Sequence, residues 1–287
     1  MLSAEDLILK TISTIVLLLI AITPIQGKAN IKAKDIDKFS RRLAPEVWKT
    51  KTCDGYKTGN PETEVKGIVV TWMATINVIE RAIKENCNFI ITHEPTFFNH
   101  WDQTEDFKDD PAYLKKKKLI DENNIVIYRL HDSWDLYPKY GIHDSWAEQL
   151  GLSKRVAKSG KSTVFEITPI SFEEFIKIVK QKMNHPSLKA LGNPNKKITK
   201  IGLGVGAWGG INNLKDFMKL GIDLFITGET SEWQTVRYAQ DSGICMIVVG
   251  HTRSETAGMQ NCANFFKKSY PKLKVIFIDA GDPYIYF

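Results

Sequence analysis

Histidine and carboxylate side chains occur together in three short, widely separated segments of this 287-residue chain. Each segment directly follows an apolar run that is typical of a buried β-strand. Ligands bind at the carboxyl ends of the strands of α/β sheets, so residues that are distant in sequence can converge there. Two imidazoles and three carboxylates at such an edge would suit one or two divalent cations. The candidate metal ligands are His93, Glu94, Asp135, His251 and Glu255.

The first segment, His93-Glu94-Pro95, ends a predicted strand. Side chains that are adjacent on a strand point to opposite faces, but Pro95 keeps Glu94 out of the helical conformation. Both side chains can then face one site. The alternative is a surface loop that contains a histidine and a glutamate by chance.

The second segment is His131-Asp-Ser-Trp-Asp135. A carboxylate here can bridge two cations, and the His131 imidazole can ligate a metal or relay a proton. The alternative is structural: Asp132 and Ser133 would cap the next turn while His131 packs against its neighbours.

The third segment, His251-Thr-Arg-Ser-Glu255, places two ligand types four residues apart, on one face of a helix. The same residues from Thr252 onward fit a capping box, in which Glu255 would only cap the helix. These two interpretations are compatible. Glu229 and Glu232 form a further acidic pair. They could act as a base or as hydrogen-bond partners of the metal ligands; the alternative is that they are first-turn acids favoured by the helix dipole.

The order of the predicted elements indicates an α/β protein. Strands and helices alternate after a first helix and a polar loop, and Ser171-x-x-Glu174 predicts a helix start. The predicted helices are 33–43, 76–85, 112–123 and 145–150, the loop is 49–61, and the strands are 65–71, 89–92, 125–130, 164–167, 196–205, 224–227 and 245–249.

Two stretches of the chain look like copies of one another. The first ends Asn88-Phe-Ile-Ile-Thr-His-Glu94 and the second ends Asp223-Leu-Phe-Ile-Thr-Gly-Glu229. Each follows a predicted strand and helix of similar length, which indicates an internal duplication of one β-α-β unit. The alternative is a chance similarity between two short apolar strands.

Composition and charge exclude few classes of protein. The chain is 43% hydrophobic with a net charge of +6, which fits a globular protein with an ample core. The longest basic run, Lys115 to Lys118, favours a solvated helix face over a nucleic-acid patch. None of the four cysteines forms a C-x-x-C pair. A structural zinc knuckle is therefore not expected, and Cys87 and Cys245 are predicted to be core thiols.

The first 29 residues differ from the rest. An apolar core at 12–22 and a small-x-small pattern at Gly27-Lys-Ala29 resemble a secretory signal peptide, and the core is short for a membrane span. We expect export to the periplasm or outside the cell, or a cytoplasmic protein if this leader is not functional. No other membrane span is expected.

Together the motifs resemble the dinuclear-metal-centre hexameric proteins called GTP cyclohydrolase 1 type 2 homologs, or the Nif-three-like family. The resemblance covers about residues 31–287. It rests on the segments already described and on further motifs: Gly141-x-x-Asp144, Leu150-Gly-Leu, Ile-Thr-Gly228-Glu and Asp282-Pro283.

The resemblance implies two similar α/β lobes with a dimetal site in the cleft between them, assembled as a homohexamer. Lobe one would cover about residues 30–160 together with the C-terminal end. A short middle segment would cover about 161–196, and lobe two about 197–287. The implied ligands of two divalent ions (iron, zinc, manganese or magnesium) are His93, Glu94, Asp135, His251 and Glu255. The family usually has a second histidine where this chain has Glu94.

Two hypotheses about function follow. The first is a metal-dependent hydrolase of a small, nucleotide-like substrate. In it, His131 or Glu229 moves the proton, and Trp101, Trp134 and Trp233 offer stacking surfaces. Core packing is the alternative for these tryptophans. The second hypothesis is a non-catalytic metal-binding protein whose ring is a scaffold.

Overall fold

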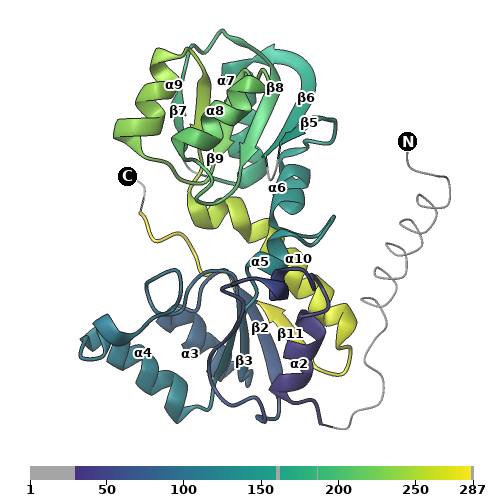
Figure 1. The fold of residues 1–287 in the computed structure, drawn as a ribbon, viewed down its shortest axis with the longest axis vertical. Coiled ribbons are helices and arrows are strands. Elements are labelled where there is room, and N and C mark those ends of the chain that lie inside the picture. The colour runs from purple at the N-terminus through teal and green to yellow at the C-terminus, as the bar shows by residue number, and fades with distance from the viewer. Residues whose placement is uncertain (1–29, 160–161, 186, 286–287) are drawn as a thin grey trace, which may run out of the picture. The chain divides into compact units, whose positions relative to one another are not determined.

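The computed structural model describes residues 30–159, 162–185 and 187–285, and the chain divides into two units. Among these residues, unit 1 contains 30–137 and 260–280, and unit 2 contains 138–259 and 281–285 (Figure 1). The predicted leader lies outside the described residues. Within the described part of the chain, no helix is long and apolar enough to cross a membrane.

Unit 1 is built on a five-stranded sheet in the order β1-β4-β3-β2-β11. Neighbouring strands are parallel except at one edge, where β1 pairs with β4 in the antiparallel direction. The strands are β1 (Gly55–Thr58), β2 (Gly67–Thr71), β3 (Phe89–Thr92), β4 (Val126–Arg129) and β11 (Lys274–Phe277). Every residue of β2, β3 and β4 is buried, as expected for parallel strands that are covered on both faces.

Helices α3 (Ile76–Lys84) and α4 (Pro111–Glu122) cover one face of this sheet through a common apolar cluster. Thr75 accepts a hydrogen bond from the Val78 backbone and caps α3, while Asp110 caps α4. Phe39 of α2 (Ala33–Ser40) packs against Phe265 and Phe266 of α10 (His251–Ser269) and against Tyr270, which follows this helix.

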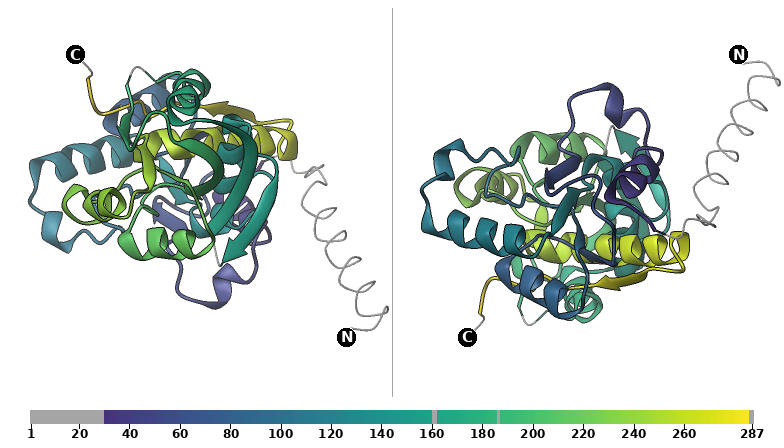
Figure 2. Two further views of the ribbon diagram at one scale, coloured as in Figure 1. Left: turned by 90° about the horizontal axis from the view of Figure 1, so that it is seen from above. Right: turned by 90° about the horizontal axis from the view of Figure 1, so that it is seen from below.

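Unit 2 has a six-stranded sheet in the order β5-β6-β8-β9-β10-β7. Its centre, β8-β9-β10, is parallel, and β5, β6 and β7 are antiparallel to their neighbours. The strands are β5 (Arg155–Ser159), β6 (Ser162–Ser171), β7 (Lys189–Leu191), β8 (Lys197–Gly204), β9 (Leu224–Thr227) and β10 (Cys245–Val248). The register of β6 shifts between Glu166 and Ile170, and the long strands curve, as Figure 2 shows from above.

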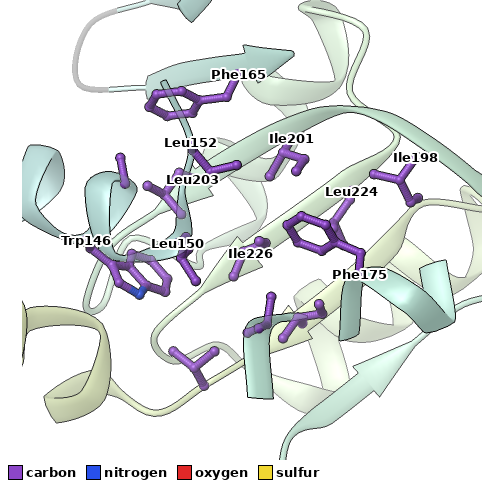
Figure 3. Close-up of a cluster of buried hydrophobic side chains, with 14 of the residues drawn as sticks. Trp146, Leu150, Leu152, Phe165, Phe175, Ile198, Ile201, Leu203, Leu224 and Ile226 are labelled. Atoms are coloured by element: carbon purple, nitrogen blue, oxygen red, sulfur yellow. The ribbon is translucent and has the colours of Figure 1, made fainter. Parts of the chain in front are cut away.

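The larger core cluster of unit 2 lies under α6 (Ile142–Leu150) and α7 (Phe172–Met183) (Figure 3). Trp146 and Phe175 from these helices pack with strand residues such as Ile201 and Ile226. Helices α8 (Ile211–Lys219) and α9 (Arg237–Asp241) bury Leu214, Phe217 and Ala239 in a second cluster. Ser171 and Glu174 form the predicted capping box of α7.

The two sheets share a local plan, which agrees with the predicted duplication. Each holds three consecutive parallel strands, β2-β3-β4 and β8-β9-β10, joined by crossover helices. The backbone N–H of Leu130 bonds to Thr92 in one unit, and that of Val249 bonds to Thr227 in the other. These bonds make the ends of β3 and β9 equivalent, and likewise the ends of β4 and β10.

One prediction about organisation needs correction. The predicted loop 49–61 contains β1, which pairs with the end of β4. Along the chain, the division between the two units falls near residues 137, 259 and 280. The predicted middle segment, about 161–196, contains β6, α7 and β7, and because β6 pairs with β8, these elements belong to unit 2.

Candidate metal centre

The ends of β3 and β4 bring the first two predicted segments together in unit 1. The backbone N–H groups of His93 and Glu94 both donate to the carbonyl oxygen of Trp72, at 3.0 and 2.8 Å. This fork ends the ladder between β2 and β3 and turns the chain away from the sheet. The His93 side chain is fully buried, while Glu94 is partly exposed.

Asp54 fixes the segment that follows β4. Its carboxylate accepts hydrogen bonds from the backbone N–H groups of His131, Asp132 and Ser133, at 2.7, 2.8 and 2.9 Å. These groups belong to the first turn of α5 (Asp132–Asp135), where helical N–H groups lack partners within the helix. Asp54 therefore holds the short helix that carries Asp135.

Donor atoms in unit 1 lie at the separations expected of ligands that share a cation. His93 Nε2 is 3.7 Å from Asp135 Oδ1, and His131 Nε2 is 3.7 Å from Glu94 Oε1. Two ligands that are each about 2.1 Å from a tetrahedral ion lie about 3.4 Å apart. The other ring nitrogen of His93 is 3.4 Å from the Leu130 carbonyl oxygen, which orients the imidazole.

His131 is the most strongly perturbed titratable group of the cluster. Its ring stacks on that of His93 at 4.3 Å, and its Nδ1 lies 2.9 Å from Asp132 Oδ1. Burial lowers the pKa of His131, but the hydrogen bond to Asp132 and the contacts with Cys53 and Asp135 outweigh it and raise the pKa to about 11. The same hydrogen bond to His131 holds the pKa of Asp132 well below its usual range. The cluster thus stabilises positive charge.

The end of β10 carries a second cluster, in unit 2. His251 Nε2 lies 3.2 Å from Glu255 Oε1, one helical turn further along α10. His251 Nδ1 lies 3.4 Å from Glu229 Oε2, at the end of β9. The two ring nitrogens therefore face different carboxylates. Glu255 is buried, whereas Glu229 is largely exposed.

Gly206 leaves space in front of the His251–Glu255 pair. It has a φ of +57°, and a Cβ at this position would come within 2.1 Å of Glu255 Oε1 and 2.8 Å of His251 Nε2. Its N–H donates to Ser254 Oγ, which in turn donates to the His251 carbonyl oxygen. The loop after β8 is thus tied to the first turn of α10 with only a hydrogen atom facing the two donors.

Replacing Gly206 with alanine is expected to weaken Zn²⁺ binding by at least about tenfold, because the methyl group would occupy the space beside the two donors. Zinc titration in competition with a chelator measures this change. Gly221→Ala is the matched control, since Gly221 also has a positive φ (+76°) but its Cβ would meet no atom within 4 Å. Equal losses in both variants would show that backbone strain alone is responsible.

The chemistry of the donors fits the divalent metals expected from the sequence. Imidazole nitrogen and carboxylate oxygen suit zinc, iron and manganese, and the partly carboxylate composition also admits magnesium. Each predicted ligand lies at the end of a parallel strand or in the first turns after it: His93 and Glu94 after β3, Asp135 after β4, and His251 and Glu255 after β10.

The structure also decides several of the alternatives. α10 begins at His251, so Thr252 lies inside the first turn and is not the N-cap of a capping box. Asp132 bonds to His131 and Thr52, and the capping of α5 comes from Asp54. Glu232 pairs with Lys189 on the surface. Of the three tryptophans, Trp134 is in the core, while Trp101 and Trp233 are exposed.

Four residues at this site were not expected from the sequence: Cys53, Asp54, His100 and Arg129. Cys53 and Asp54 precede β1, and a four-residue strand with one aromatic side chain gives little signal. His100 lies in the loop after β3, with its ring 6.0 Å from that of His131. Arg129 ends a strand whose other residues are apolar or aromatic, and only its complete burial marks it. All four cysteines are buried and free, which agrees with the core thiols predicted at Cys87 and Cys245.

Comparison with known families agrees with the sequence motifs. The model of the family DUF34/NIF3 (NGG1p interacting factor 3) matches residues 31–283. The chain belongs to this family. The match contains both units and all five predicted metal ligands.

Individual DUF34/NIF3 relatives extend over most of the chain. A GTP cyclohydrolase 1 type 2 homolog from Clostridium acetobutylicum is 30% identical over 79% of this chain and 86% of its own length. A protein of the same name from Chlamydia pneumoniae is 27% identical over 84% of this chain and 95% of its own length. The crystal structure of a Bacillus cereus protein related to NIF3 has a TM-score of 0.77, covers 91% of this chain and 100% of its own, and is 16% identical. That last likeness concerns the fold.

Proposed function

We propose that this chain binds two divalent metal ions and is a metal-dependent hydrolase. The proposed ligands are His93, Glu94 and Asp135 from unit 1 and His251 and Glu255 from unit 2. The observation that carries the proposal is the spacing of imidazole and carboxylate donors at the ends of parallel strands: 3.7 Å between His93 and Asp135 in unit 1 and 3.2 Å between His251 and Glu255 in unit 2. When bound, the ions would polarise an electrophile and lower the pKa of a water molecule.

His131 is the proposed group for proton transfer. Asp132 accepts a hydrogen bond from Nδ1 and so fixes the ring, which leaves Nε2 on the side of Glu94. Because its pKa is raised, the His131 ring is protonated near neutral pH, so its Nε2–H can donate a proton as a general acid. The proposed role of Glu229 is to orient His251 and not to act as a base. Its carboxylate faces His251 Nδ1, which directs Nε2 toward Glu255.

A cavity of about 300 Å³ supports a small-molecule substrate. It lies at the ends of β8 and β9 in unit 2, and Glu229 is part of its wall together with Gly209, Gly210 and Thr235. Glu229 thus connects this cavity with the proposed ligand His251. The shared name of the curated relatives points to GTP as one substrate to test.

The test is a turnover screen of the metal-loaded protein with GTP, phosphoesters and amides. We expect hydrolysis in at least one class, and its loss in Asp135→Ala. Asp144→Ala is the matched control, because Asp144 pairs with Arg155 in unit 2 and is not a proposed ligand. Turnover that survives in Asp135→Ala would exclude this centre as its source. A metal-loaded protein without turnover in any of these classes would support the scaffold hypothesis.

A further inference from the structure

Arg129 is a fully buried cation at the end of β4. A buried charge is costly unless it is paired and hydrogen-bonded. Its Nε donates to the carbonyl oxygen of His93 at 2.8 Å, and its Nη1 donates to that of His100 at 2.5 Å. These two bonds tie two points of the loop that follows β3, its start at His93 and His100 further along, to one side chain. They are bonds to neutral groups, so the balancing charge has to come from carboxylates.

Two carboxylates face the guanidinium group. Asp102 Oδ2 lies 3.7 Å from Nη1, and Glu94 Oε2 lies 3.5 Å from Nη2. Asp102 is almost completely buried, and its Oδ1 accepts hydrogen bonds from the backbone N–H groups of Thr96 and Phe97. Asp102 therefore stabilises the conformation of the loop. Glu94 is the carboxylate that connects Arg129 with the proposed metal centre.

The two oxygens of Glu94 face different partners. Oε2 is the one nearest Arg129, while Oε1 lies 3.7 Å from His131 Nε2. Nη2 of Arg129 makes no hydrogen bond among the described residues, although the atom is buried. Glu94 therefore has one oxygen in an ion pair with Arg129 and the other turned toward His131.

We propose that Arg129 is the positioning residue of Glu94: it holds Oε2, so that Glu94 offers only Oε1 to a metal ion. This inference rests on the proposed metal binding. A glutamate side chain has several torsions to restrict, and a ligand fixed by a partner outside the coordination sphere loses less freedom when the metal binds. The positive charge of Arg129 has an opposing effect, because it repels the cation. Asp102 balances part of that charge, so orientation dominates.

The test is the dissociation constant for Zn²⁺ of the full chain, measured by competition with a chelator. Arg129→Met is expected to bind Zn²⁺ about 10-fold to 100-fold more weakly than the unmodified protein. In a Glu94→Ala background, the same change at Arg129 is expected to have little further effect on Zn²⁺ binding, because Arg129 acts through Glu94. The double-mutant cycle measures this coupling. Lys57→Met is the matched control, since Lys57 is a partly buried cation whose Nζ lies 3.9 Å from Asp102 Oδ2.

A second variant tests the inference if Arg129→Met does not fold. Glu94→Asp keeps the charge but shortens the side chain by one methylene, so the carboxylate is no longer able to stay at Arg129 and still reach the ion. It is expected to weaken Zn²⁺ binding to a similar extent while urea unfolding of the metal-free protein changes little.

Four results would overturn the inference. Arg129→Met that binds Zn²⁺ as tightly as the unmodified protein would show a purely structural role, and tighter binding would show that charge repulsion dominates. An equal loss with and without Glu94 would show that the effect does not pass through this carboxylate. If the unmodified protein binds no Zn²⁺, the proposed function itself fails, and this inference fails with it.

Discussion

Replacing Asp54 with alanine is expected to destabilise the metal-free protein by about 3 kcal/mol. The Asp54 carboxylate is buried and accepts three backbone N–H groups at the start of α5. Alanine would leave these donors without an acceptor in the protein. Urea unfolding monitored in metal-free buffer measures the change. Because α5 carries Asp135, Zn²⁺ binding should weaken as well.

Asp54→Asn is the matched variant for this prediction. Its remaining carbonyl oxygen can still accept from His131 and Asp132, while the amide nitrogen would face the N–H of Ser133. We therefore expect a smaller loss, of about 1 to 2 kcal/mol. An Asp54→Ala variant within about 0.5 kcal/mol of the unmodified protein, the range of ordinary surface substitutions, would refute the anchoring role of Asp54.

The second large effect is expected from His251→Ala. This change should lower the metal content of the reconstituted protein by about one equivalent, because it removes the imidazole that faces Glu255 and leaves a glutamate pair in its place. Elemental analysis after dialysis measures the content. His143→Ala is the control, since His143 is partly buried and pairs with Asp144 but is not a proposed ligand. A full metal complement in His251→Ala would remove this residue from the ligand set.

Much of the fold was predictable because its central strands are short, apolar and bounded by turns. Phe89–Thr92 and Leu224–Thr227 have the predicted bounds, and the polar residues that follow them lie at strand ends as expected. Parallel strands are buried on both faces, so their sequences carry a strong local signal. The same signal brought His93, Glu94 and Asp135 into one predicted site.

The contacts that support the site were not predictable in the same way. Asp54 reaches α5 only because β1 pairs with β4, and that pairing joins segments that are far apart in the sequence. Neither the hydrophobic pattern nor the β-propensity of Gly55–Thr58 predicts an edge strand. The burial of Arg129 depends on the loop that follows β3 folding over it. Assembly into a hexamer and export of the chain stay predictions.

The metal content of the purified full chain tests the central claim most directly. The protein would be reconstituted separately with zinc, iron and manganese, freed of loosely bound ions by dialysis, and measured by elemental analysis. We expect about two divalent ions per chain for at least one of these metals. Less than about one equivalent of each metal after reconstitution would contradict the assignment of the site.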